Sequence, residues 1–201
     1  EPMHPQYQLL KASIKRNRLF LMLLPLLALI TFVNFMPQTF SPNYLQNQQN
    51  LDLAAIGGLG SLGSLSNAVF MLALGNLKPA FGLLLGQALV GCFTLLLLFG
   101  NDLIWFQLGY LLLGSTRLGR SMALAFARRF IRADETGLAF GLIETLNGAA
   151  LFLASALAGL LYAGQPNSIY SIGLILVGVS IAVSAVMLPW LSRRHALQEA
   201  A

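Results

Sequence analysis

Long apolar runs separated by short polar segments make up most of this chain. A helix needs about 20 mostly apolar residues to cross the hydrocarbon core of a bilayer, and it satisfies its own backbone hydrogen bonds. Six stretches meet this requirement, approximately Leu19–Gln38, Leu51–Leu74, Pro79–Phe99, Leu103–Ala127, Thr136–Ala163 and Ile169–Leu191. The pattern therefore predicts an all-α polytopic membrane protein with a bundle of six transmembrane helices.

The composition supports lipid rather than water as the main surroundings. Of the 201 residues, 57% are hydrophobic and only 9% are charged, whereas soluble domains carry about 25% charged residues. A soluble fold of this length could not bury so many apolar side chains. We therefore expect the lipid bilayer to be the chain's main partner.

The basic residues alternate between connectors, which predicts an orientation through the positive-inside rule. Ten of the twelve precede the first segment or follow the second, fourth or sixth: Lys11, Lys15, Arg16, Arg18, Lys78, Arg128, Arg129, Arg132, Arg193 and Arg194. The connectors 39–50, 100–102 and 164–168 contain none. We expect residues 1–18 to form a cytoplasmic linker, 192–201 a cytoplasmic tail, and the bacterial inner membrane to be the location. Since the basic residues stand between apolar runs, no nucleic-acid partner is expected.

Three charged residues lie deep within apolar segments. Arg117 precedes Arg128 by a helical rise of about 16 Å, and Arg120 lies one turn nearer the cytoplasmic end. Glu144 lies about 12 Å beyond Thr136, at the depth of Arg120. An ion pair between Arg120 and Glu144 is predicted, leaving Arg117 less compensated. Three interpretations stay open: a structural tie between helices, binding of an anionic solute by Arg117 or Arg120, and proton coupling through Glu144.

Small residues are concentrated in the second and fifth segments. The second contains Gly57, Gly58, Gly60 and Gly63 among serines, and the fifth contains Gly137, Gly141, Gly148 and Gly159. Because close helix contacts in lipid favour small residues, we expect these two helices to be tightly packed.

Three stretches resemble helices of the major facilitator superfamily. NRLFLMLLPLLALITFVNFMPQTFSPNYLQ resembles the family's seventh helix, and LDLAAIGGLGSLGSLSNAVFMLALGNLKP its eighth with the loop that follows. RADETGLAFGLIETLNGAALFLASALAGLLY is similar to the eleventh. Of the family's charged loop motif, Gly75, Leu77 and Lys78 remain.

The resemblance implies the C-terminal half of a twelve-helix carrier, with a second six-helix half as partner. The six helices would form two three-helix inverted repeats, 19–99 and 103–191. In that arrangement the first and fourth helices line a central cavity, the second and fifth meet the other half, and the third and sixth face lipid. Besides Arg117 and Arg120, the cavity candidates are then Asn34, Tyr110 and Thr116.

The function expected from these features is secondary active transport of a small solute by alternating access, with proton coupling as an option. The alternative is a standalone six-helix channel or a subunit of a membrane complex. An enzyme is not expected, because no histidine, carboxylate and nucleophile gather at membrane depth. With His4 and His195 in the polar ends and Cys92 as the single cysteine, neither a metal site nor a cofactor is expected.

Overall fold

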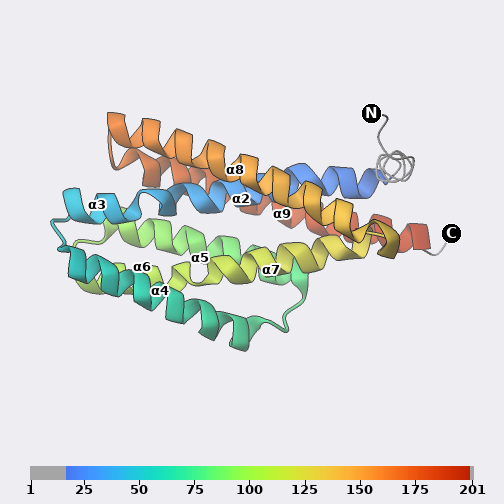
Figure 1. The fold of residues 1–201 in the computed structure, drawn as a ribbon, viewed down its shortest axis with the longest axis horizontal. Coiled ribbons are helices and arrows are strands. Elements are labelled where there is room, and N and C mark those ends of the chain that lie inside the picture. Colours follow the sequence, from blue (N-terminus) through green and yellow to red (C-terminus); the bar gives the residue numbers. More distant parts are fainter. Residues whose placement is uncertain (1–16, 200–201) are drawn as a thin grey trace, which may run out of the picture.

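The computed structural model describes residues 17–199, which form a bundle of helices without a strand in that range (Figure 1). The helices are α2 (Arg18–Thr39), α3 (Ser41–Asn47), α4 (Leu53–Leu74), α5 (Pro79–Phe99), α6 (Leu103–Leu113), α7 (Ser115–Ala127), α8 (Thr136–Gly164) and α9 (Ser168–Glu199). Two short 3-10 turns, η1 (Arg128–Phe130) and η2 (Ala133–Glu135), connect α7 to α8. Residues 1–16 of the predicted linker lie outside the described part.

Five helical stretches of the described chain are long and apolar enough to cross a membrane. They contain α2, α4, α5, α8 and α9. This confirms the prediction of an all-α membrane protein. The predicted fourth segment differs, because it is divided at Gly114 into α6 of 11 residues and α7 of 13 residues, each too short to span the hydrocarbon alone.

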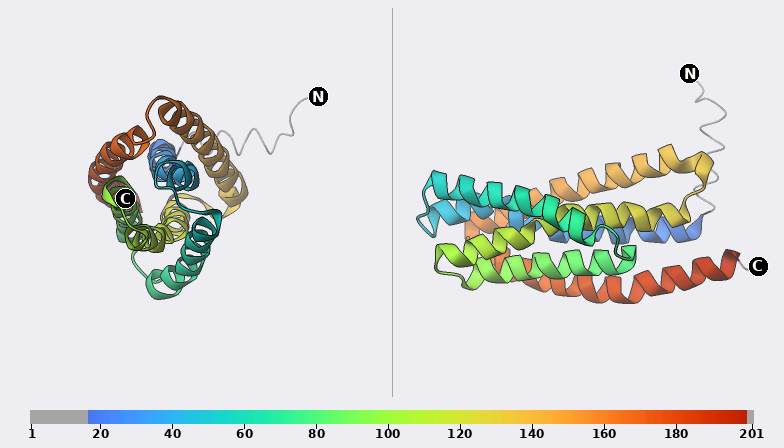
Figure 2. Two further views of the ribbon diagram at one scale, coloured as in Figure 1. Left: turned by 90° about the vertical axis from the view of Figure 1, so that its left-hand side faces the viewer. Right: turned by 90° about the horizontal axis from the view of Figure 1, so that it is seen from below.

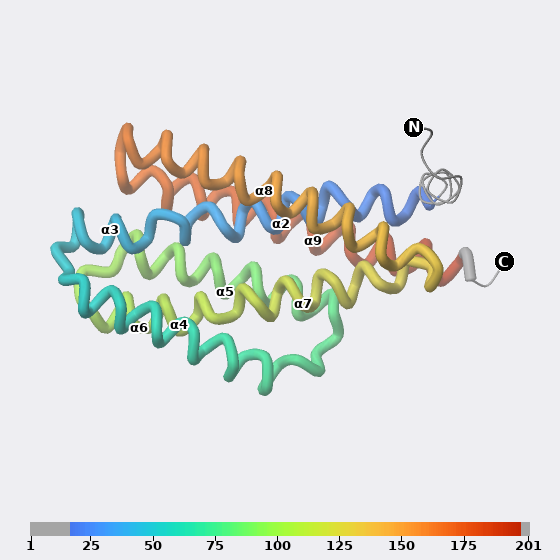
Figure 3. The backbone as a smooth tube through the Cα atoms, in the orientation of Figure 1, coloured from blue at the N-terminus to red at the C-terminus, as the bar shows by residue number. Residues whose placement is uncertain are grey.

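The division between α6 and α7 has a physical cause in a neighbouring helix. The hydroxyl of Ser66 on α4 donates a hydrogen bond to the Leu111 carbonyl, which in a continuous helix would accept from the Ser115 amide. A side chain inserted into the helical ladder bends or interrupts it. Gly114 permits this approach, because a Cβ there would collide with Ser66. The two helices still follow each other end to end along the bundle (Figure 3).

Helical structure extends beyond two of the predicted segments. The connector 39–50 contains α3, which has proline in its first turn, where the missing amide hydrogen costs no hydrogen bond. The predicted tail from residue 192 continues α9 as helix to Glu199. Within α2, neither Pro25 nor Pro37 ends the helix.

The start of α2 and the end of α9 lie at the same end of the bundle (Figures 1 and 2). The α7–α8 connection lies at that end too, and the α4–α5 connection is directed toward it. A ring contact of 4.9 Å between Phe130 in η1 and His195 in α9 joins two of these segments. The basic connectors therefore gather toward one end, as the charge pattern predicts.

The core forms where α5 packs on α6, α7 and α9, and where α2 packs on α8 and α9. The backbones of α5 and α7 approach closely at Gly86 and Gly119, where a Cβ on Gly86 would lie 3.2 Å from the Gly119 Cα. Gln87 on α5 is fully buried and hydrogen-bonds Ser180 and Ser184 of α9 at 2.7 and 3.1 Å. Small residues and one polar cluster thus hold α5 in the bundle.

The glycines of α4 and α8 do not pack as predicted. A Cβ placed on Gly57, Gly58, Gly60, Gly141 or Gly148 would meet nothing within 4 Å. These helices are also the least buried of the candidate spans, with 17% and 22% of their apolar stretches buried against 50% for α5. Within the described chain, the expected tight packing is therefore absent at these five glycines, whereas Gly63 approaches Tyr110 and Gly159 approaches Phe40. In Figure 1 α8 and α4 lie along opposite edges of the bundle, with α2 and α7 between them.

Candidate functional site

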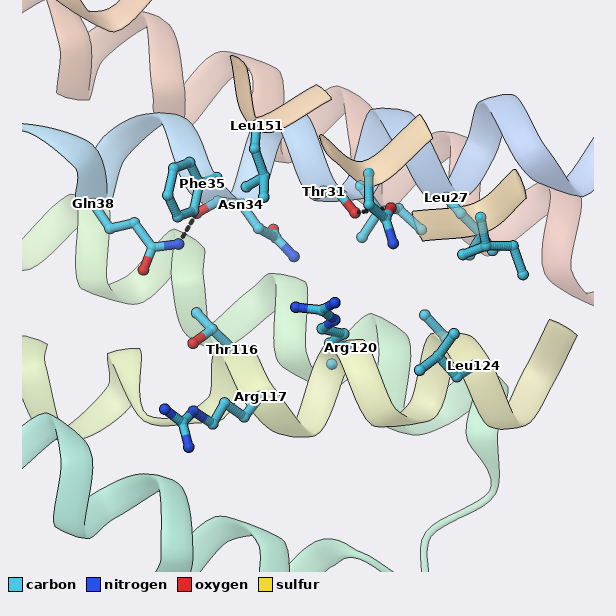
Figure 4. Close-up of a pocket in the computed structure, with 15 residues that line it drawn as sticks. Leu27, Thr31, Asn34, Phe35, Gln38, Thr116, Arg117, Arg120, Leu124 and Leu151 are labelled. Atoms are coloured by element: carbon cyan, nitrogen blue, oxygen red, sulfur yellow. Dashed lines mark hydrogen bonds between the residues drawn. The ribbon is translucent and has the colours of Figure 1, made fainter. Parts of the chain in front are cut away.

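A cavity of about 220 Å³ lies between α2, α7 and α8 (Figure 4). Side chains and backbone from all three helices line it: Leu27, Ile30, Thr31, Asn34, Phe35 and Gln38 of α2, Thr116, Arg117, Gly119, Arg120, Ala123 and Leu124 of α7, and Ile143, Asn147 and Leu151 of α8. Four of the five predicted cavity residues meet here, namely Asn34, Thr116, Arg117 and Arg120. They come from helices far apart in sequence.

The predicted ion pair between α7 and α8 is present. Arg120 Nη2 donates to Glu144 Oε2 at 2.5 Å, so the pair spans from one wall of the cavity to the other. The two side chains remain 61% and 44% exposed. Both partners are therefore open to whatever covers this face of the bundle.

Arg117 has no carboxylate within 4.0 Å among the described residues. In Figure 4 its side chain points away from Arg120, toward α4. It lies in the first turn of α7 and is exposed. With Arg120 neutralised by Glu144, Arg117 is the uncompensated cation of the cavity, and the trio carries a net charge of +1.

In Figure 4 the Asn34 side chain points from α2 toward Arg120, whereas the Arg117 side chain is directed to the other side of α7. The Oδ1 atom of Asn34 is buried and has no hydrogen-bond partner among the described residues. Its backbone carbonyl accepts from the Gln38 side chain at 3.2 Å. The side-chain amide of Asn34 is therefore not held by the protein and can turn toward a ligand.

Tyr110, the fifth predicted cavity residue, lies elsewhere. It is only 5% exposed, and its hydroxyl is 3.0 Å from the Ser41 hydroxyl at the start of α3. Its ring meets Phe93 edge to face with centroids 5.8 Å apart. In this arrangement Tyr110 joins α6 to α3 and α5. The prediction placed it by helix number alone, without its direction around the helix.

Three polar lining residues, Thr31, Gln38 and Asn147, were not among the predicted site residues. Thr31 donates to Asn147 Oδ1 at 2.9 Å and so joins α2 to α8. Gln38 lies near the other end of the cavity. A signal for Thr31 and Gln38 was available in the sequence, because Leu27, Thr31, Asn34 and Gln38 are spaced by three or four residues and therefore share one face of α2.

The site contains no arrangement suited to holding a metal. Within residues 17–199, no group of three or more His, Cys, Asp or Glu side chains is close enough to bind a metal ion. The chemistry that the cavity can offer is hydrogen bonding and charge pairing through arginine, amide and hydroxyl groups beside aliphatic side chains.

Comparison with known proteins finds no family model, curated protein or solved structure that matches this chain.

Proposed function

We propose that this chain is one half of a secondary transporter, resembling the C-terminal half of a major facilitator carrier, and that its cavity forms one wall of the site for a small solute. The observation that carries the proposal is that Arg117, Arg120 and Glu144 lie on an exposed face, within the predicted spans 103–127 and 136–163 and not in the connectors. An arginine at the bilayer centre costs about 2.5–3.5 kcal/mol on insertion scales. A face with three such charges is therefore better covered by water and a second bundle than by lipid.

The opposite surface of the bundle has the character of a lipid-facing one. Its exposed side chains include Phe81 on α5 and Ile175, Val179 and Val186 on α9, all apolar. The open surface of α4 and α8 also exposes large apolar side chains, such as Leu72 and Phe152, but places glycine, serine and threonine between them. Because small residues permit close helix approach, we assign the α4–α8 side to contact with a second six-helix half.

The course of the chain supports six crossings. The start of α2 and the end of α9 lie at the same end of the bundle, so the chain should cross the membrane an even number of times. Five crossings come from the candidate spans, and α6 together with α7 would form the sixth as one broken helix. Broken helices are common at transporter binding sites. The basic end would then be cytoplasmic, in a bacterial inner membrane.

The packing also fits two inverted repeats, 19–99 and 103–191. The first helix of one repeat would correspond to the first of the other, which pairs α2 with α6–α7, α4 with α8 and α5 with α9. α2 packs on α8 and α9, while α6–α7 packs on α4 and α5, and α5 packs on α9. If the two repeats are exchanged, the contact of α2 with α8 becomes that of α6–α7 with α4, and the contact of α2 with α9 becomes that of α6–α7 with α5. The contact of α5 with α9 is unchanged. Two repeats related by a twofold axis should show such equivalent contacts.

Accessibility to water tests the placement of the cavity. In the full-length protein with Cys92→Ser, single cysteines replace Thr116 and Asn34 in the cavity and Val179 on the apolar face. A water-soluble maleimide should label the first two at least tenfold faster than Val179→Cys in native membranes. If all three positions react equally slowly, the cavity faces lipid and the proposal is wrong.

Counterflow tests transport itself. Vesicles containing the full-length protein are loaded with a candidate solute, and uptake of the same labelled solute is measured from outside. In a carrier, unlabelled solute inside the vesicles accelerates uptake of the labelled solute, because the binding site returns to the outside with solute bound. Uptake through a channel is not accelerated in this way. Uptake without this acceleration would favour a channel, and the absence of uptake for every solute tested would favour a non-transporting subunit.

A further inference from the structure

We infer that the cavity binds an organic carboxylate, and that Arg117 rather than Arg120 is the residue that pairs with it. This inference rests on the proposed function and names the class of solute. It follows from three features of the cavity: which arginine is already neutralised, which polar groups stand beside the other arginine, and what the remaining lining consists of.

Arg120 is the less suitable partner for an anion. Its guanidinium already donates to Glu144 at 2.5 Å, and a second carboxylate there would lie close to the Glu144 charge. Like charges at such separation repel. An anion that engaged Arg120 would therefore have to displace Glu144 or share the guanidinium with it.

Arg117 has neither obstacle. No described carboxylate lies within 4.0 Å of it, and a guanidinium can donate two parallel hydrogen bonds to a carboxylate. Thr116, next in sequence, lines the same cavity and offers a hydroxyl. Asn34 also lines the cavity, and its Oδ1, an acceptor, has no hydrogen-bond partner among the described residues. The donors available to an anion are therefore the Arg117 guanidinium and the Thr116 hydroxyl.

The rest of the lining indicates an organic anion rather than an inorganic one. Leu27, Ile30, Leu124 and Ile143 contribute aliphatic side chains from all three helices. A small inorganic ion would leave this surface uncovered, whereas the body of an organic acid would bury part of it, at about 25 cal/mol per Å² of apolar area. The lining therefore favours a carboxylate attached to an apolar body.

The test measures binding to the purified full-length protein by isothermal titration calorimetry. The probes are benzoate, hexanoate and lactate, each compared with its neutral amide, together with inorganic phosphate. At least one organic carboxylate should bind, its amide at least tenfold more weakly. Arg117→Gln should raise the Kd for that acid at least tenfold, and Arg117→Lys should have a smaller effect, because lysine keeps the charge without the two-pronged geometry.

The matched control removes a cation outside the cavity. Arg132→Gln, in the connection between α7 and α8 where Arg132 pairs with Asp134 at 3.5 Å, changes the net charge by the same amount as Arg117→Gln, and its Kd should stay within about threefold of the wild-type value. Gel filtration and the melting temperature establish that each variant is folded before it is titrated.

The inference is overturned if no carboxylate binds, if the amides bind as well as the acids, or if Arg117→Gln leaves the Kd unchanged. Binding of phosphate with equal affinity would overturn the organic part of the assignment. These failures differ from failure of the carrier proposal. If no carboxylate binds but Thr116→Cys is labelled rapidly by the maleimide and a neutral solute shows counterflow, the protein is still a carrier, but for another class of solute.

Discussion

Arg120 and Glu144 form an ion pair of 2.5 Å that joins α7 to α8. These helices are the two walls of the cavity, and each packs on α2 at its floor. The pair therefore connects α7 to α8 across the cavity and cancels one positive and one negative charge within the predicted spans. Removing one partner alone leaves the other uncompensated.

We expect the two single substitutions to be more harmful than the double one. Arg120→Gln and Glu144→Gln should each lower the melting temperature of the purified full-length protein, while Arg120→Gln/Glu144→Gln should recover part of the loss. Because both side chains are about half exposed, the coupling energy should be about 0.5–1 kcal/mol, typical of solvent-screened pairs.

The pair between Arg132 and Asp134 provides the comparison. Its atoms are 3.5 Å apart, and its side chains are 65% and 66% exposed in the connection between α7 and α8. Its double-mutant cycle should give a coupling energy smaller than that of Arg120 with Glu144. Strictly additive losses in the Arg120–Glu144 cycle would show that the pair contributes no interaction energy.

Glu144 is also the carboxylate suited to proton coupling. If its protonation is part of the transport cycle, Glu144→Gln should abolish accumulation driven by a pH gradient while leaving solute exchange intact, because glutamine keeps the shape and cannot release a proton. The measurement compares uptake into vesicles with and without an imposed gradient. Asp134→Asn, in the connection outside the cavity, serves as control and should accumulate solute normally. Full accumulation by Glu144→Gln would exclude this role.

The ion pair could be predicted because depth along a helix follows from residue count. Arg120 lies eight residues before Arg128, and Glu144 eight residues after Thr136, so helical rise places both at one level. Direction around the helix was harder to derive. Tyr110 lies on a predicted lining helix but points into the packing with Ser41 and Phe93.

The break at Gly114 could not be predicted from the fourth segment alone. That segment has no proline, and although its sequence changes at the glycine from LIWFQLGYLLL to the more polar STRLGRS, polarity alone does not end a helix. The cause is Ser66, 48 positions earlier, whose hydroxyl takes the Leu111 carbonyl. The exposed glycines of α4 and α8 were also difficult to interpret from the sequence. A small residue permits close contact with another helix but does not specify which helix that is.

The buried cluster around Gln87 should stabilise the contact between α5 and α9. Gln87 is fully buried and is bonded to Ser180 and Ser184 at 2.7 and 3.1 Å. Gln87→Leu should cost about 1 kcal/mol, in the range measured for hydrogen bonds between membrane helices. The readout is the free energy of unfolding in mixed micelles. Gln107→Leu is the control, because no hydrogen bond is found for the Gln107 side chain within residues 17–199; an equal loss in both variants would contradict a specific role for the cluster.

Gly114 should be among the glycines least tolerant of a side chain. In a helix, alanine is intrinsically more favourable than glycine by about 1 kcal/mol, so the substitution would stabilise wherever space is available. At Gly114 the added methyl group would collide with Ser66 on α4, and overpacking of this kind costs about 1–3 kcal/mol. Gly114→Ala should therefore lower the melting temperature, whereas Gly178→Ala, which meets nothing within 4 Å on α9, should keep or raise it.

Because the collision involves the Ser66 backbone as well as its hydroxyl, Gly114→Ala/Ser66→Gly should recover only part of the loss. Equal melting temperatures for Gly114→Ala and Gly178→Ala would mean that α4 does not approach α6 and α7 closely, and that the interruption between them has another cause.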